Sequence, residues 1–149
     1  MKMDIKHVVD GKQDYIPMLL IADQQVDMIE KYLDRGELYA LYDPDLRAAC
    51  VLTDEGEGVF ELQNIAVLPE YQRRGYGRKL VKHLVDSSKG RAKVLMVGTG
   101  DSPMTLPFYQ QCGFVFSHRI KNYMTDHYYQ PVLEDGVQLF DKVYLKMDL

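Results

Sequence analysis

The stretch at residues 67–78 is Val67-Leu68-Pro69-Glu70-Tyr71-Gln72-Arg73-Arg74-Gly75-Tyr76-Gly77-Arg78. It joins a predicted strand to a predicted helix, and the first turn of a helix attracts phosphates through free backbone N–H groups and partial positive charge. Gly75 and Gly77 let the main chain approach a ligand without an intervening Cβ, and Arg73 and Arg74 add charge. The stretch predicts a pyrophosphate-binding turn. The competing interpretation is a glycine-containing loop with solvated arginines.

The segments around this turn predict a strand–helix–strand unit. Residues 59–67 have a strand pattern, and the helix after Gly75 has Leu80, Val81, Leu84 and Val85 on one face. Residues 94–97 form a short apolar run typical of a buried strand, which we expect to lie parallel to 59–67. Such crossovers are right-handed and place a ligand crevice at the carboxyl ends of the strands, where residues 98–100 lie.

The other segments complete a sheet with helices. Residues 38–42, 46–53 and 59–67 predict an antiparallel meander. A first strand at 3–9 precedes two helices, one from Asp14 and one with Asp23 as N-cap and Gly36 as C-terminal stop. A short helix from about Thr105 to Cys112 precedes two final strands at 114–118 and 137–147.

Composition excludes several classes of function. The 149 residues are 46% hydrophobic and 27% charged, as expected of one globular domain, residues 1–149. A net charge of −4 without a basic stripe argues against nucleic acid. Spans of about 20 apolar residues are missing, so we expect no membrane segment and a cytoplasmic protein. The two cysteines do not form the spacing pattern of a disulfide framework. The four histidines do not have the spacing of metal ligands.

Two motifs resemble those of the GNAT acetyltransferase superfamily. One is the strand, the turn beginning with Gln72 and the following helix; the other is Phe108-Tyr109-Gln110-Gln111-Cys112-Gly113-Phe114. The resemblance extends over about residues 38–147, whereas a dinucleotide-binding fingerprint has three glycines and matches less well. It implies an α/β (α+β) acyl-CoA N-acyltransferase fold, a mixed central sheet of six to seven strands flanked by about four helices. It also implies acetyl transfer from acetyl-CoA to a primary amine by direct attack in a ternary complex, without a metal.

The resemblance assigns the coenzyme contacts residue by residue. Ile65, Ala66 and Val67 match the bulged strand that pairs with the pantetheine arm. Ser102 stands where the family often has an asparagine, so the contacts there depart from the pattern. The remaining implied contacts are Gln72, Arg73, Arg74, Gly75, Tyr76, Gly77, Arg78 and Phe108.

Acid and base candidates also follow from the resemblance. Tyr109 would protonate the departing thiolate, as a weak acid of pKa about 10 can; the alternative is a buried tyrosine with its hydroxyl hydrogen-bonded. Glu61, six residues before Val67, would take the proton of the amine. Its alternative is a strand-end charge that faces solvent or pairs with an arginine.

The acceptor is predicted less sharply. Between the last strands lies an aromatic and acidic cluster that suits a cationic amine, although a polar surface loop explains it equally well. Its members are Tyr123, Asp126, Tyr128, Tyr129, Glu134 and Asp135. We favour a small-molecule amine over a protein amino group. The competing function is an acyl-CoA binding or sensing domain without turnover, and many members of the family form homodimers.

Overall fold

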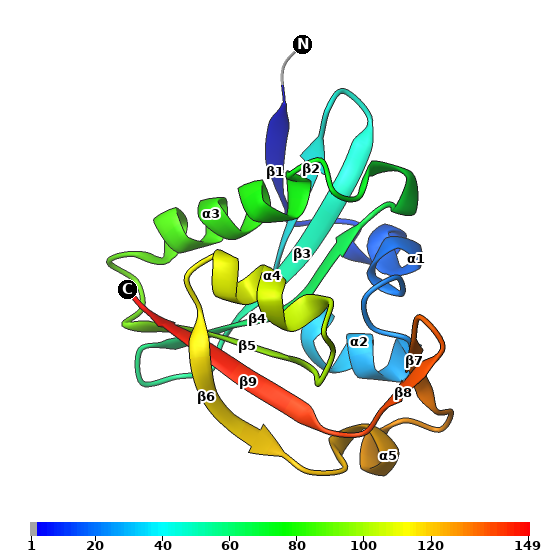
Figure 1. Ribbon diagram of the computed structural model, residues 1–149. Helices are drawn as coiled ribbons and strands as arrows, with labels where there is room; N and C mark the ends of the chain where they lie inside the picture. Colours follow the sequence, from blue (N-terminus) through cyan, green and yellow to red (C-terminus); the bar gives the residue numbers. More distant parts are fainter. Residues whose placement is uncertain (1–2) are drawn as a thin grey trace.

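The computed structural model describes residues 3–149, and its main feature is one seven-stranded sheet (Figure 1). The strands of this sheet are β1 (Asp4–Val8), β2 (Glu37–Tyr42), β3 (Leu46–Asp54), β4 (Val59–Val67), β5 (Val94–Gly100), β6 (Val115–Ile120) and β9 (Lys142–Asp148). Their order is β1-β2-β3-β4-β5-β9-β6, and β4 and β5 are parallel while the other neighbours are antiparallel. The mixed sheet predicted from the sequence is therefore confirmed.

Helices cover both faces of the sheet (Figure 1). The helices are α1 (Ile16–Leu19), α2 (Val26–Leu33), α3 (Tyr76–Ser88), α4 (Thr105–Gln111) and α5 (Tyr123–His127), with 3-10 turns at Lys12–Tyr15 and Pro69–Tyr71. The first two pack on one face, and α3 and α4 pack on the other. A separate hairpin, β7 (Val132–Glu134) and β8 (Val137–Leu139), precedes β9. Over residues 3–149, no helix is long and apolar enough to cross a membrane.

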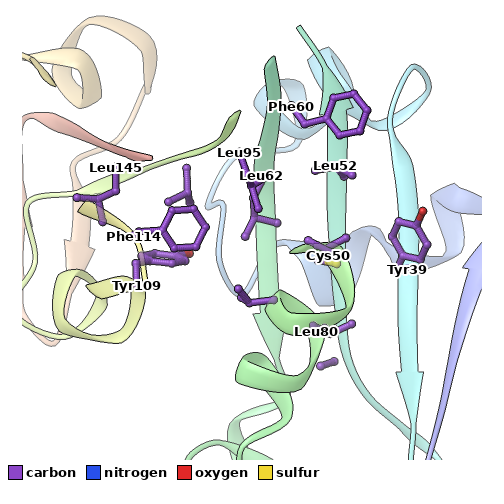
Figure 2. Packing of buried hydrophobic residues seen from close by; sticks show 14 of the residues in the cluster. Tyr39, Cys50, Leu52, Phe60, Leu62, Leu80, Leu95, Tyr109, Phe114 and Leu145 are labelled. Atoms are coloured by element: carbon purple, nitrogen blue, oxygen red, sulfur yellow. The ribbon is translucent and has the colours of Figure 1, made fainter. Parts of the chain in front are cut away.

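The larger of two apolar clusters lies between the sheet and α3 and α4 (Figure 2). Leu80 and Leu84 of α3 are fully buried against the strands, as their i, i+4 spacing requires. Tyr109 and Phe114 meet edge to face with ring centroids 5.9 Å apart, and Figure 2 shows both rings beside Leu145. This packing fixes α4 against β5 and β9.

A β-bulge interrupts the pairing of β3 with β4. Val51 pairs with Asn64, but Leu52 pairs with Leu62, so Gln63 has no residue opposite it. A bulge adds one residue to a strand and reverses the alternation of its side chains. The bulged strand implied by the family resemblance is therefore present.

The reversal decides which side chains of β4 face α3. Before the bulge Leu62 faces α3, and after it Ile65 and Val67 do. Glu61 points to the opposite face, because it alternates with Leu62. Ala66 packs on that opposite face with α1 and α2. The two faces of β4 thus present different chemistry on either side of Gln63.

The parallel strands β4 and β5 separate after the bulge. Their pairing ends where Leu62 meets Val97, although β4 continues to Val67 and β5 to Gly100. On its other side β5 stays paired with β9 to Gly100. The unpaired ends of β4 and β5 therefore diverge, and no strand of residues 3–149 lies between them.

Two element predictions were wrong. The second helix begins at Val26 with Gln25 as N-cap, because the Asp23 carboxylate accepts hydrogen bonds from distant tyrosines and does not cap it. The expected single strand at 137–147 is divided into β8 and β9 by residues 140–141. Asp141 accepts a bond from the Asn122 N–H, which draws the chain away from regular pairing there.

Candidate active site

A cleft of about 1030 Å³ opens where β4 and β5 separate. This volume is at the upper end of the range of small-molecule and cofactor sites, about 300–1,000 Å³. Residues from β4, the phosphate turn, β5 and α4 line one part of it. The other part is lined by residues 21–24, α2 and the segment from Tyr123 to Lys142. We call these the coenzyme half and the acceptor half.

The phosphate turn is built as an anion site. Gly75 has φ 85° and stands at the N-cap of α3, with no side-chain cap, so the first N–H groups of a 13-residue helix stay free. A Cβ on Gly77 would lie 3.2 Å from Phe108 Cζ and 3.6 Å from Val67 Cγ2. Only a glycine leaves this approach between α3, α4 and β4 uncrowded. Gly77 therefore lets α3 pack closely on α4 and β4 beside the turn.

Side-chain contacts hold the turn in place. Gln72 Nε2 donates to the Val67 carbonyl at 3.1 Å, which closes the turn onto the end of β4. The Tyr76 hydroxyl donates to Asp43 at 2.8 Å, and Arg78 Nη2 donates to Gln111 Oε1 at 3.0 Å. The last contact ties α3 to α4. Both walls of the coenzyme half are thus joined at the mouth of the cleft.

The structure brings most of the predicted coenzyme contacts together. Those that line the cleft are Ile65, Ala66, Val67, Gln72, Arg73, Gly75, Tyr76, Gly77, Arg78 and Phe108. Arg74 is not among the lining residues of the described chain, and its guanidinium lies 5.4 Å from the Tyr71 ring centroid. Ser102 is not among them either. It is 2% exposed, and its hydroxyl donates to Glu134 at 2.7 Å.

Tyr109 enters the cleft from α4 on the α3 side of the sheet. It is 7% exposed, and its hydroxyl forms no hydrogen bond with any residue in the described part of the chain. The alternative of a hydroxyl bonded within the protein is therefore not what is observed. Burial raises the pKa of Tyr109 above its usual value, because the charged form is poorly solvated there. A protonated hydroxyl is thus available to a group in the cleft.

Glu61 lies on the opposite face of β4, two residues before the bulge. It is not one of the cleft-lining residues in the part of the chain that the structure describes. Burial raises the pKa of Glu61, and the charge of Lys142 acts in the other direction. Glu61 is half-buried rather than exposed, and it has no arginine at salt-bridge distance within residues 3–149, so neither alternative from the sequence is observed. A raised pKa makes the Glu61 carboxylate a stronger proton acceptor than an exposed one.

A polar network that the sequence did not predict holds the acceptor half together. Asp23 accepts hydrogen bonds from the hydroxyls of Tyr32, at 2.8 Å, and Tyr128, at 2.6 Å. The Tyr32 hydroxyl in turn accepts one from Asn64 Nδ2 at 3.1 Å. Asn64 lines the cleft and is 4% exposed, and its Oδ1 has no partner among the described residues. The network links the bulge of β4 to the segment after α5.

The aromatic and acidic cluster predicted for the acceptor is only partly assembled. Tyr123, Tyr128, Glu134 and Asp135 line the cleft. Tyr129 is 81% exposed and donates to Asp27 instead. A cation missed in the sequence, Lys142, lines this half as well. Within residues 3–149, no group of histidine, cysteine and carboxylate side chains is arranged to hold a metal.

Comparisons with known proteins point to one family. Residues 34–116 match the family model described as an acetyltransferase (GNAT) domain. The chain is 32% identical over 151 residues to the uncharacterized N-acetyltransferase YvbK of Bacillus subtilis, covering 99% of this chain and 97% of YvbK.

Solved structures agree over the whole length. A GNAT family acetyltransferase from Elizabethkingia anophelis with acetyl-CoA bound is 33% identical, with a TM-score of 0.92 over 99% of this chain and 98% of that one. A Bacillus subtilis acetyltransferase in complex with CoA is 32% identical, with a TM-score of 0.90 over 99% of each chain.

Proposed function

The chain belongs to the GNAT acetyltransferase family and transfers an acetyl group from acetyl-CoA to an amine, and we propose that this amine is carried by a small molecule. The observation that carries the proposal is a pair of hydrogen bonds that join the two sides of the acceptor half. The segment after α5 reaches across to residues 23–27. Gln24 Nε2 donates to the Leu133 carbonyl at 2.8 Å, and the Tyr128 hydroxyl donates to Asp23 at 2.6 Å.

This covering limits what can enter. A polypeptide amino group reaches a buried site only through a groove that accepts several residues of chain. Here the acceptor half is lined by Leu133, Tyr128 and Lys142. On the outside, the Tyr129 hydroxyl donates a hydrogen bond to Asp27, which holds the segment after α5 against α2. A compact amine can occupy the acceptor half while the hydrogen bonds between the segment after α5 and residues 23–27 stay formed.

The coenzyme half accommodates acetyl-CoA. We propose that the free N–H groups at the start of α3 bind the pyrophosphate and that Arg73 and Arg78, both in the cleft lining, add charge. The backbone of residues 65–67 after the bulge would pair with the pantetheine arm. Gly77 allows Phe108 and Val67 to pack closely against the first turn of α3 beside this strand.

The chemistry uses both faces of the sheet. Glu61 takes a proton from the amine, directly or through a water, and the amine nitrogen bonds to the thioester carbonyl carbon. The carbon–sulfur bond breaks, and Tyr109 donates its proton to the departing sulfur. A thiolate is a better leaving group when it is protonated as it departs, since a thiol has a pKa of about 8.5. Because Glu61 and Tyr109 lie on opposite faces, one group serves the amine and the other the sulfur.

The test is an acceptor panel with acetyl-CoA as donor. Polyamines, amino sugars and amino acid amides are compared with peptides that carry a free N-terminus, and thiol release is followed. We expect release with at least one small amine and none above background with the peptides. Preferred turnover of a peptide would contradict the small-molecule proposal. Tight coenzyme binding with no thiol release from any amine would favour a sensing domain instead.

A further inference from the structure

Lys142 places an amine of the protein itself in the acceptor half of the cleft. It is the first residue of β9 and pairs with Gly100 and Ile120 in the sheet. Its side chain crosses Gly98, where an added Cβ would collide with Lys142 Cε. Gly98 is the first residue of β5 beyond the pairing with β4. The lysine therefore lies at the point where the two strands separate.

Two aromatic rings enclose the ammonium group. Lys142 Nζ is 4.5 Å from the ring centroid of Tyr123 and 4.9 Å from that of Tyr144, which is the geometry of cation–π contacts. The Tyr144 ring is held by stacking on His118, with centroids 4.7 Å apart. One of the two interpretations of the sequence is an aromatic and acidic cluster here that suits a cationic amine, and Tyr123 belongs to that cluster. The chain fills that place with its own lysine.

Carboxylates complete the surroundings. Glu61, Asp23 and Glu55 are the acidic groups whose charges act on Lys142. Glu55 is paired with Arg35 at 2.8 Å, and Asp23 accepts bonds from two tyrosine hydroxyls, whereas Glu61 forms no salt bridge in the described chain. Burial outweighs these charges and lowers the pKa of Lys142 below its usual value. A lowered pKa increases the share of the neutral, nucleophilic amine.

We infer that Lys142 is itself an acetyl acceptor, and that the enzyme acetylates it when acetyl-CoA is bound and no amine substrate is present. The inference rests on the proposed function. A new bond forms between Nζ and the acetyl carbonyl carbon, and the carbon–sulfur bond breaks. Glu61 receives the proton that Nζ gives up, and the coenzyme leaves as a thiol with a proton from Tyr109. No further reactant is needed.

Acetylation would change the acceptor half in two ways. It removes the positive charge that opposes the raised pKa of Glu61, and it adds a group that occupies the space for the amine. The modified enzyme is therefore expected to turn over an added amine more slowly. Substrate amine, by filling the same place first, protects Lys142.

The experiment incubates the purified enzyme with acetyl-CoA alone and follows each lysine by peptide mass mapping. Lys82 is the internal reference, because its side chain is 76% exposed and outside the cleft, so it reports chemical acetylation by the thioester. Since proximity to a bound reactant accelerates transfer strongly, we expect Lys142 to be modified at least about tenfold faster than Lys82. Excess CoA should suppress only the reaction at Lys142.

Each outcome decides the inference. Equal rates at Lys142 and Lys82, or a Lys142 rate that CoA does not lower, would overturn it. The Lys142→Arg variant checks the site, since its intact mass should lack the fast acetyl group while the slow one at Lys82 remains. If Lys142 stays unmodified while an added amine is acetylated, this inference fails and the proposed function stands. If neither reacts, the proposed function fails as well.

Discussion

Replacing Gly77 with alanine should separate coenzyme binding from folding. Gly77 is the second residue of α3, and an alanine methyl group there would lie 3.2 Å from Phe108 Cζ. Phe108 has to move by a few tenths of an ångström to accept it. Alanine is favoured over glycine in a helix by about 1 kcal/mol, which offsets this crowding. We expect the free energy of unfolding without coenzyme to change by less than about 1 kcal/mol.

The same methyl group should impair coenzyme binding. It fills the gap between the first turn of α3 and Phe108, both of which line the cleft. If one hydrogen bond from a free N–H to the charged pyrophosphate is lost, the cost is about 1.5–3 kcal/mol. At 1.4 kcal/mol per tenfold, Kd for CoA should rise roughly 10- to 100-fold. The Michaelis constant for acetyl-CoA should rise with it.

Calorimetric titration with CoA gives Kd, and thermal unfolding with and without CoA gives stability. The matched control is Ser87→Ala, which also introduces alanine into α3 but lies outside the cleft lining. It should keep the wild-type affinity. An unchanged CoA affinity in Gly77→Ala would refute the assignment of this turn as the pyrophosphate site. Equal weakening in Ser87→Ala would show that the effect comes from the helix as a whole.

Three further substitutions test the catalytic groups and the acceptor half. Glu61→Gln should lower kcat/KM about 10²- to 10⁴-fold and abolish its fall at low pH, which in the wild type follows the burial-raised pKa of Glu61. A pH–rate profile that keeps its shape would assign the base to another group or to water. Tyr109→Phe should lower kcat by a similar factor, about 10²–10⁴, with little change in acceptor KM; wild-type kcat in a thiol-release assay would exclude the acid role. Tyr128→Phe removes the 2.6 Å bond to Asp23, so urea unfolding should show a loss of about 1.5–3 kcal/mol and acceptor KM should rise. The matched control is Tyr39→Phe, which removes a 2.6 Å bond to Glu37 outside the cleft lining and should leave acceptor KM as it is, so a matching rise there would contradict the role of the buried network.

Local patterns predicted the part of the site that is built from neighbouring residues. The strand, turn and helix around Gly75 depend on hydrophobic periodicity and on glycine at a positive φ, and both are visible over a dozen residues. The start of α4 at Thr105 followed from Pro107, which fits only in a first turn because it lacks an N–H. The coenzyme half is therefore the half that the sequence predicts.

The acceptor half depends on contacts that no local pattern shows. Asp23 has the residue type and spacing of a helix cap, yet its partner Tyr128 is 105 residues away. Lys142 is a single charged residue at the start of a strand, which usually faces solvent. It is half-buried because Gly98 offers a space on a strand that is distant in sequence. The surroundings of Asp23 and of Lys142 are therefore both set by contacts with residues that are distant in sequence.

The bulge at Gln63 connects the two halves. Because it adds one residue to β4, Val67 faces α3 and lies beside Gly77, while Asn64 faces α2 and joins the Asp23 network. In a strand without the extra residue, both of these side chains would point to the wrong face. The position of the phosphate turn and the position of the acceptor network are thus set by the same backbone irregularity. In the proposed mechanism, a coenzyme along residues 65–67 would lie between Tyr109 on one face and the amine on the other.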